Sequence, residues 1–97
     1  MQLYTAKNTK TARQLGLSAA WITEERAILN SDETTLNSIT ESLQHTTSEI
    51  DALLSKIRDN LSKRQAAYLA SDWSDYIALR ASELELFEEL DWLMDNL

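Results

Sequence analysis

The sequence of 97 residues contains no cysteine, no proline and a single glycine, Gly16. Without cysteine there is neither a disulfide framework nor a thiolate zinc site, and the composition fits a cytoplasmic protein. Turns that need a positive φ have almost no residue to supply it, which argues against a turn-rich β fold. No apolar run is long enough to span a membrane, and the first residues lack the apolar segment of a signal peptide, so no membrane partner is expected. These absences favour an all-α protein.

Basic residues are also in the minority. Nine Lys and Arg stand against sixteen Asp and Glu, which gives a net charge of −7. A field of this sign repels phosphates, so direct binding of nucleic acid is not expected. One glycine is too few for a phosphate-binding loop or a nucleophile elbow. His45 has no acid–base partner beside it and lacks the Glu-x-x-His spacing of di-iron bundles. We therefore predict no catalytic residue, no metal ion and no cofactor.

The most regular pattern lies in residues 71–97. Their apolar side chains recur in steps of three and four, which is the spacing of one helical face. They are Tyr76, Leu79, Leu86, Leu90, Leu93 and Leu97, and Glu83 occupies the remaining position of the repeat. The segment also holds eight acids and one base, Arg80, so it carries the whole net charge, and residues 1–70 sum to zero. A helix that is apolar on one side and acidic on the other needs protein to cover its apolar side.

The N-terminal third is predicted to contain one short helix. Residues 1–16 carry Lys and Arg but no acid, and we interpret them as a loose basic arm. Gly16 can adopt the left-handed conformation that ends a helix. Ser18 is a good N-cap for a following helix over residues 19–30. The polar residues at 30–33 then predict a break.

The middle of the chain is predicted to form one long helix over residues 32–70. No Gly or Pro enforces a stop there, and a single Thr in the apolar seam, Thr46, is tolerable. The alternative is a break near Thr46, with helices over 32–44 and 48–70. The C-terminal helix packs antiparallel on this segment. The expected fold is thus one domain over residues 1–97, a small helical bundle or a long antiparallel helical hairpin.

The C-terminal helix supplies two sets of candidate functional residues. Glu83 lies inside the apolar stripe, where it must either reach water or form a register-setting ion pair, and Arg64 is the candidate partner. The second set comprises residues that we expect to contact a partner: Trp73, Tyr76, Ile77, Glu85, Phe87, Glu88, Glu89 and Trp92. Trp92 projects onto the acidic face, and an exposed Trp is a typical binding anchor. Burial in a three-helix bundle or a dimer is the alternative for these aromatic residues.

Residues 61–90 read as a helix, a short corner and a second helix. The corner is Ala70-Ser71-Asp72-Trp73, and the second helix carries Leu79, Arg80, Leu86 and Leu90. In this helical pattern the segment resembles the flagellar type III export chaperones. The resemblance implies a partner that is an amphipathic helix of an export substrate.

Binding of a protein partner, helical or basic, is therefore the expected function, without enzymatic activity, as a chaperone, an adaptor or an inhibitor. A second hypothesis is an acidic decoy of the phage or plasmid type, which blocks a nucleic-acid-binding site on a host protein. A third is a structural homo-oligomer, since a homodimer would cover apolar surface that a chain of this size leaves wet. The salt dependence of binding distinguishes the first two hypotheses.

Overall fold

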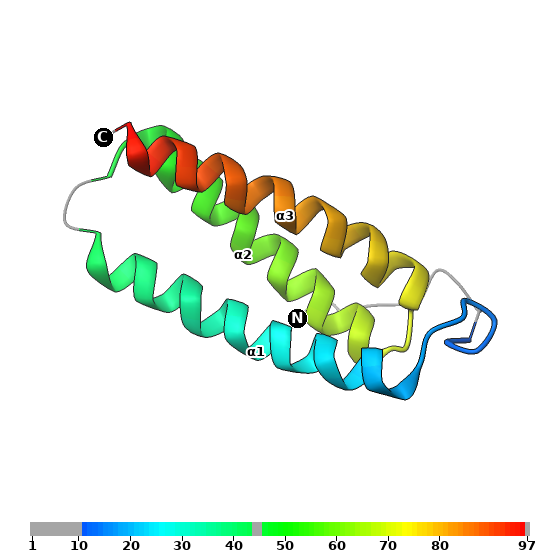
Figure 1. Ribbon diagram of the computed structural model, residues 1–97. Coiled ribbons are helices and arrows are strands. Elements are labelled where there is room, and N and C mark those ends of the chain that lie inside the picture. Colours follow the sequence, from blue (N-terminus) through cyan, green and yellow to red (C-terminus); the bar gives the residue numbers. More distant parts are fainter. Residues whose placement is uncertain (1–10, 44–45, 97) are drawn as a thin grey trace.

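The computed structural model describes residues 11–43 and 46–96. Three helices make up the fold: α1 (Ala19–Ser42), α2 (Ser48–Leu69) and α3 (Trp73–Asp95). They form a bundle in which α2 runs antiparallel to both α1 and α3 (Figure 1). The described ranges contain no strand. The predicted all-α helical bundle is therefore confirmed.

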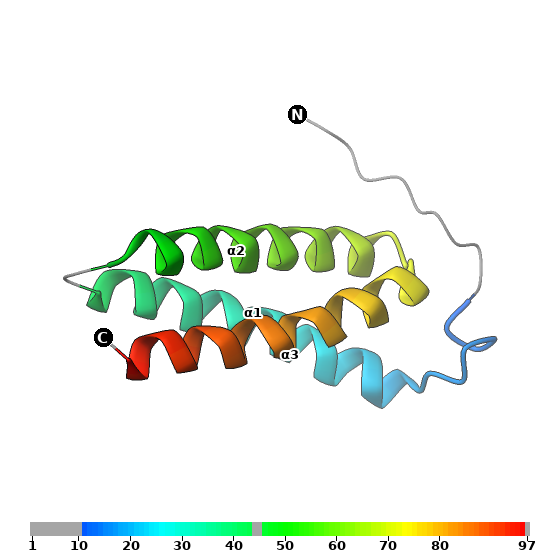
Figure 2. The same cartoon turned by 90° about the horizontal axis from the view of Figure 1, so that it is seen from above.

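The central helix is α2. It contributes six of the buried apolar side chains of the core: Ile50, Leu53, Leu54, Ile57, Leu61 and Ala67. Two more come from α1 (Leu29 and Leu36) and three from α3 (Trp73, Tyr76 and Leu90). Full burial of one large apolar side chain stabilises the fold by about 1.5–3 kcal/mol relative to exposure. α2 and α3 pack closely, and α1 lies beneath this pair and crosses under α3, so that its first turns lie on the side of α3 away from α2 (Figure 2).

Each helix begins at a polar capping residue. The side chain of Ser18 accepts a hydrogen bond from the backbone N–H three residues later at 3.0 Å. Thr47 does the same for α2 at 3.2 Å, and Asp72 for α3 at 3.3 Å. A cap of this kind contributes about 0.5–2 kcal/mol. The predicted cap at Ser18 is thus confirmed, and Asp72 caps α3 at the predicted corner.

Two residues with positive φ end helical segments. Gly16 (φ 73°) ends the turn that precedes α1, and Ser71 (φ 57°) follows the end of α2. Around Ser71 the backbone N–H of Ser71 donates to the Tyr68 carbonyl at 3.1 Å, and that of Asp72 donates to the Ala67 carbonyl at 2.9 Å. This double hydrogen bond is the Schellman motif, whose left-handed position favours glycine. Ser71 therefore holds a conformation that its side chain makes less favourable.

The predicted break at residues 30–33 is wrong, because α1 continues through them. No Gly or Pro interrupts the helix, and the Thr34 hydroxyl donates to the Asn30 carbonyl at 3.1 Å, inside the helix. Because the helix is continuous, Leu29 and Leu36, which are seven residues apart, lie on the same face, and both are buried. Polar residues alone were too weak a signal for a helix end.

The predicted continuous helix over residues 32–70 is also wrong, and the alternative break near Thr46 is confirmed. Leu43 leaves the helical conformation with ψ 113°. The N-cap of α2 is Thr47, one residue after Thr46. Reversal of the chain here brings Ile50 into the core at 1% exposure. A straight helix over the same residues would be roughly 57 Å long and would leave its seam uncovered.

Some predictions fall on residues outside the described ranges. They concern residues 1–10 of the expected basic arm, His45, and Leu97 at the end of the apolar stripe. The remainder of the arm, residues 11–16, forms a helical turn. The predicted acidic C-terminal helix corresponds to α3.

Candidate functional site

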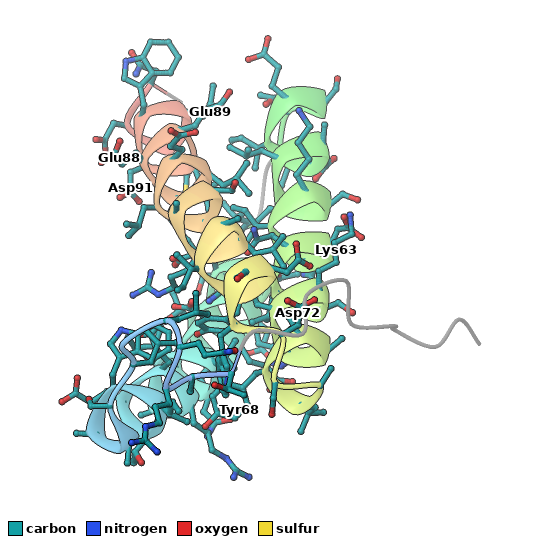
Figure 3. All side chains as sticks on the ribbon, turned by 90° about the vertical axis from the view of Figure 1, so that its right-hand side faces the viewer. Lys63, Tyr68, Asp72, Glu88, Glu89 and Asp91 are labelled. Carbon is teal, nitrogen blue, oxygen red and sulfur yellow. The ribbon has the colours of Figure 1, made fainter. Side chains whose placement is uncertain are left out.

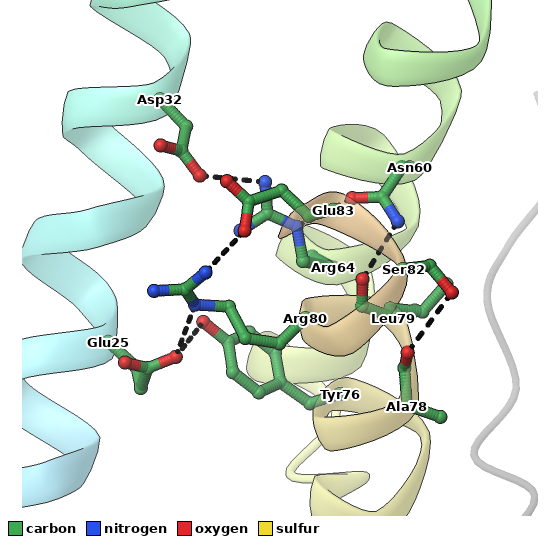
Figure 4. Close-up of polar contacts among 10 residues, drawn as sticks. All are labelled: Glu25, Asp32, Asn60, Arg64, Tyr76, Ala78, Leu79, Arg80, Ser82 and Glu83. Carbon is green, nitrogen blue, oxygen red and sulfur yellow. Dashed lines mark hydrogen bonds and ion pairs between the residues drawn. The ribbon is translucent and has the colours of Figure 1, made fainter. Parts of the chain in front are cut away.

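A layer of polar side chains joins the three helices of the bundle (Figure 4). The polar layer consists of Glu25 and Asp32 from α1, Asn60 and Arg64 from α2, and Tyr76, Arg80 and Glu83 from α3. On each helix its members stand three, four or seven residues apart, so they share a face with the core. Three carboxylates and two guanidinium groups meet here, which gives the layer a formal charge of −1.

Arg64 is fully enclosed in the polar layer, with no exposed side-chain surface. Its Nη2 donates to Asp32 at 2.9 Å, and its Nε donates to the side-chain oxygen of Asn60 at 2.8 Å. Asn60 in turn donates to the Leu79 carbonyl of α3 at 2.9 Å. Among the described residues, Nη1 of Arg64 has no hydrogen-bond partner. A charge buried this deeply depends on its ion-pair partner, because its loss leaves the charge uncompensated.

Glu25 links α1 to α3. Its Oε1 accepts hydrogen bonds from Tyr76 Oη at 3.1 Å and from Arg80 Nε at 3.0 Å. Burial raises the pKa of Tyr76, and the charge and hydrogen bond of Glu25 raise it further, so the phenol stays protonated and donates. Burial lowers the pKa of Arg80, but Glu83 and Glu25 outweigh this effect and hold that pKa above its ordinary value.

Glu83 completes the polar layer from α3. It is 5% exposed, and its carboxylate pairs with Arg80 one turn earlier. Burial raises the pKa of Glu83, and the neighbouring Asp32 raises it further. The charges of Arg80 and Arg64 lower it, but the net direction is upward. Two carboxylates therefore compete for the same two guanidinium groups, which disfavours the ionised form of Glu83.

Glu83 and Arg64, the predicted register-setting pair, both lie in the polar layer. The ion pairs join Arg64 to Asp32 and Glu83 to Arg80, rather than Glu83 to Arg64. The charge of Arg64 still acts on Glu83, since it lowers the pKa of that carboxyl. The alternative expectation, a Glu83 that reaches water, does not agree with its 5% exposure.

Glu25 and Asp32 were not among the predicted site residues. They are seven residues apart and alternate with Leu29 and Leu36 on one face of α1. That pattern becomes visible only when the helix runs through residues 30–33, where we expected a break. The signal was present, and the wrong helix boundary concealed it.

The polar layer is closed to solutes. Arg64, Glu83 and Glu25 are 0%, 5% and 6% exposed. In the described part of the chain, no three His, Cys, Asp or Glu side chains are placed to hold a metal ion. The polar layer couples the three helices, because a shift of one helix would separate buried charges from their partners.

An aromatic cluster packs beside the polar layer, at the end of the bundle where α2 turns into α3. It consists of Trp21, Tyr68, Trp73 and Tyr76, with edge-to-face ring pairs at centroid distances of 5.1 to 6.2 Å. The Tyr68 hydroxyl also donates to the Ile22 carbonyl of α1 at 3.0 Å. Trp73 and Tyr76 are 6% and 0% exposed. These two predicted partner-binding residues are core residues here, and their burial leaves no surface for a partner.

Most of the other predicted partner-binding residues lie on the outer face of α3, away from the core. We define this outer face as Ile77, Leu84, Glu85, Glu88, Glu89, Asp91, Trp92 and Asp95. Ile77, Leu84 and Trp92 are 41%, 55% and 64% exposed. Phe87 is half-buried and packs against the core instead. Figure 3 shows Glu88 and Asp91 on the side of α3 away from α2, and Glu89 on the side that faces it.

The acids of the outer face have no ion-pair partner among the described residues. The four ion pairs there are Lys63–Asp59, Arg64–Asp32, Arg80–Glu25 and Arg80–Glu83. The bases of α2 that form ion pairs or hydrogen bonds do so within α2 (Lys63) or with α1 (Arg58 and Arg64), and none of these bases forms an ion pair with the outer face. From Glu85 to Asp95 the chain has five acids and no base.

A groove of about 250 Å³ lies where the start of α2 passes the end of α3. Glu49, Ala52, Leu53 and Lys56 line it from α2, and Glu89 and Leu93 line it from α3. Its surface combines apolar side chains with two carboxylates and one ammonium group. Glu89 belongs to both the groove and the outer face, so the two surfaces are continuous.

No protein-family model, curated protein or solved structure matches this chain. The resemblance of residues 61–90 to the flagellar export chaperones therefore stays a prediction, as does the cytoplasmic location. Among the described helices, none combines the length and the apolar character that crossing a membrane requires.

Proposed function

We propose that this protein binds another protein without catalysing a reaction, as a chaperone, an adaptor or an inhibitor, and that the partner docks on the outer face of α3. One observation carries the proposal: Ile77, Leu84 and Trp92 are 41%, 55% and 64% exposed on a single helix. They lie within about a quarter-turn of one another around the axis, so they form a stripe. Single exposed apolar residues are ordinary, but three of them along one helical face are typical of a binding surface, and here Glu88 lies between Leu84 and Trp92 on that face.

Trp92 is the proposed anchor of this interface. Binding energy concentrates in a few large side chains, and Trp is the most enriched among them. The neighbouring acids Glu85, Glu88 and Asp91 keep the free surface hydrated, and they select partners by charge when the stripe is covered. Among the three roles, the resemblance of residues 61–90 to export chaperones favours the chaperone.

The test is comparative affinity capture from the source cell, read out by quantitative mass spectrometry. The bait is the full chain, as wild type, Leu84→Ser, Trp92→Ser and the control Leu69→Ser. Leu69 is 83% exposed but lies at the end of α2, so its substitution removes the same kind of side chain from another surface. Circular dichroism confirms that each bait is folded.

We expect a set of proteins that wild type and Leu69→Ser retain, and that Leu84→Ser and Trp92→Ser both lose. Equal capture by all four baits would mean that the outer face is not the interface. The comparison between variants matters here, because capture by wild type alone includes non-specific binding.

A second candidate function is the acidic decoy, which occupies a nucleic-acid-binding site on another protein. The five acids between Glu85 and Asp95 without a neutralising base favour it. Between about 0.1 M and 1 M salt the Debye length falls from about 10 Å to about 3 Å. Binding by a decoy collapses over this range, whereas docking on the apolar stripe weakens but persists.

The third hypothesis, a homo-oligomer, has the charge of the outer face against it. Two copies joined through this face would place their acids in contact, and like charges oppose association. We expect light scattering to give the monomer mass of 11.1 kDa at all concentrations. A mass that rises with concentration would favour the homo-oligomer.

A further inference from the structure

We infer that the partner of the outer face is a basic amphipathic helix, which places one of its Lys or Arg side chains in the groove between α2 and α3. This inference rests on the proposed function and adds the chemical class and the position of the partner. It draws on two features that meet at Glu89, the charge of the outer face and the lining of the groove.

The apolar stripe sets the length of the partner. From Ile77 to Trp92 it spans sixteen residues, about 24 Å along the helix axis. An α-helix of about four turns laid along α3 matches this span. Such a helix presents apolar side chains at steps of three, four and seven residues, which is the helix-in-groove mode of recognition.

The charge of the outer face sets the class of the partner. Its five acids have no ion-pair partner among the described residues, and Lys and Arg on the flanks of an apolar stripe would complement them. A second copy of this chain would not complement these acids, because its own outer face is acidic. Nucleic acid would not complement them either, because its phosphates are also negatively charged.

The groove is the proposed binding site for a basic side chain at one end of the bound helix. Around the axis of α3, Glu85 and Glu89 stand between Trp92 and Leu93, so they connect the apolar stripe to the groove. Ala52, Leu53 and Leu93 give the groove an apolar surface, and Glu49 and Glu89 contribute carboxylates from α2 and α3. A long basic side chain fits this combination, since its aliphatic stem packs on leucine while its charged head reaches carboxylates.

Lys56 is the one base that lines the groove, so a change of its charge tests the inference directly. It repels a partner that inserts a cation there. Lys56→Met keeps the apolar stem and removes the charge, so it should tighten binding of a basic helix by about 1.4- to 5-fold, which is the range for one exposed charge pair. A partner that inserts an acid would be weakened instead.

The probe is a phage-displayed library of random peptides of about sixteen residues, the length that matches the stripe. The library is selected on the immobilised full chain, and the enriched sequences are read. The best peptide is then synthesised and titrated against wild type and variants by calorimetry. Amide shifts in NMR spectra show where it binds.

We expect the enriched peptides to be positively charged, with apolar residues at helical spacing. Binding should weaken at least about 10-fold for the double variant Glu85→Lys/Glu88→Lys, since each reversal turns an attraction into a repulsion. Binding should be unchanged for Leu69→Ser. The amide shifts should change in α3 and at the groove residues Ala52 and Leu53.

Enrichment of acidic or neutral peptides would overturn the inference, and so would the absence of any enriched peptide or weaker binding by Lys56→Met. These outcomes are distinct from failure of the proposed function. If Leu84→Ser still loses partners from the cell extract, the outer face remains an interface and only the basic class is wrong. If Leu84→Ser loses none, the proposed function itself fails.

Discussion

The two faces of α3 carry the same kinds of side chain in opposite surroundings. Leu90 on the inner face is 0% exposed, whereas Leu84 on the outer face is 55% exposed. Glu83 is buried and paired with a guanidinium group, whereas Glu88 is exposed without an ion-pair partner among the described residues. The difference arises because α2 and the polar layer cover one side of the helix only. A substitution on the inner face should therefore change stability, and one on the outer face should change binding.

The largest effect is expected for Arg64→Ala. Removing this buried guanidinium leaves Asp32 and Glu83 without its charge, and breaking a buried ion pair costs about 3–5 kcal/mol of unfolding free energy. The control is Lys63→Ala, next in sequence, whose side chain is 57% exposed and pairs only within α2. It should change stability by less than about 0.5 kcal/mol. Urea denaturation followed by circular dichroism measures both, and equal losses would mean that the polar layer is not a stabilising unit.

Leu90→Ala and Leu84→Ala make the comparison between the faces directly. The same substitution on the same helix should cost about 2–5 kcal/mol at Leu90, because it leaves a cavity in a packed core. At Leu84 it should cost less than about 0.5 kcal/mol. Thermal and urea unfolding of both variants give the difference. A loss at Leu84 as large as that at Leu90 would show that the outer face is covered in solution.

Tyr76→Phe tests the link between α1 and α3. It removes the hydroxyl that donates to Glu25, and we expect a loss of about 1–3 kcal/mol, the cost of a buried acceptor that loses a donor. The folded-state pKa of Tyr76 is raised above its ordinary value of 10.0. The associated stability is therefore complete below pH 10 and is lost as the pH rises further. The variant lacks this alkaline loss, so its stability deficit should shrink above pH 10.

Glu83→Gln should change how the unfolding free energy depends on pH more than it changes the unfolding free energy at neutral pH. It weakens the contact with Arg80 but removes the excess negative charge of the polar layer, so the net change should be less than about 1.5 kcal/mol. The folded-state pKa of Glu83 is raised above 4.5, so the folded wild type binds more protons than the unfolded chain above that pH. The stability of wild type relative to the variant should therefore fall as the pH rises from 4.5. A difference that does not vary with pH would contradict the raised pKa.

The smallest effect is a gain. Ser71→Gly relieves the left-handed conformation at the end of α2 and should stabilise the protein by about 0.5–1 kcal/mol, after the greater flexibility of the unfolded chain is counted. Ser62→Gly is the control in the exposed middle of α2, where the change from serine to glycine should cost about 0.5 kcal/mol. A higher unfolding free energy for Ser71→Gly and a lower one for Ser62→Gly, both measured by urea unfolding, would confirm the Schellman motif. A loss at both positions would contradict it.

The elements were predictable from the sequence wherever a specific residue sets the boundary. Ser18, the Ser71–Asp72 corner and the apolar repeat of α3 gave the helix starts and the all-α fold correctly. The two errors, at residues 30–33 and at Thr46, fall where polar residues are the only signal. Polar residues are compatible with both an exposed helix and a loop, so packing decides between them.

The candidate site was predictable only in part, for a related reason. Glu83 stood out because it interrupts an apolar repeat. Glu25 and Asp32 did not, because their repeat crosses a boundary that we placed wrongly. Trp73 and Trp92 are similar in sequence terms, and only the position of α1 and of Tyr68 buries the first and leaves the second exposed.

Local sequence patterns establish that this protein is helical, that its last helix has an apolar and an acidic side, and where most helices begin. These properties depend on residue spacing and on capping, which act over a few positions along the chain. The tertiary structure alone decided which carboxylate meets which guanidinium, which aromatic residues are buried, and which stripe of α3 remains open. Those outcomes depend on contacts between residues far apart in sequence, which local patterns do not specify.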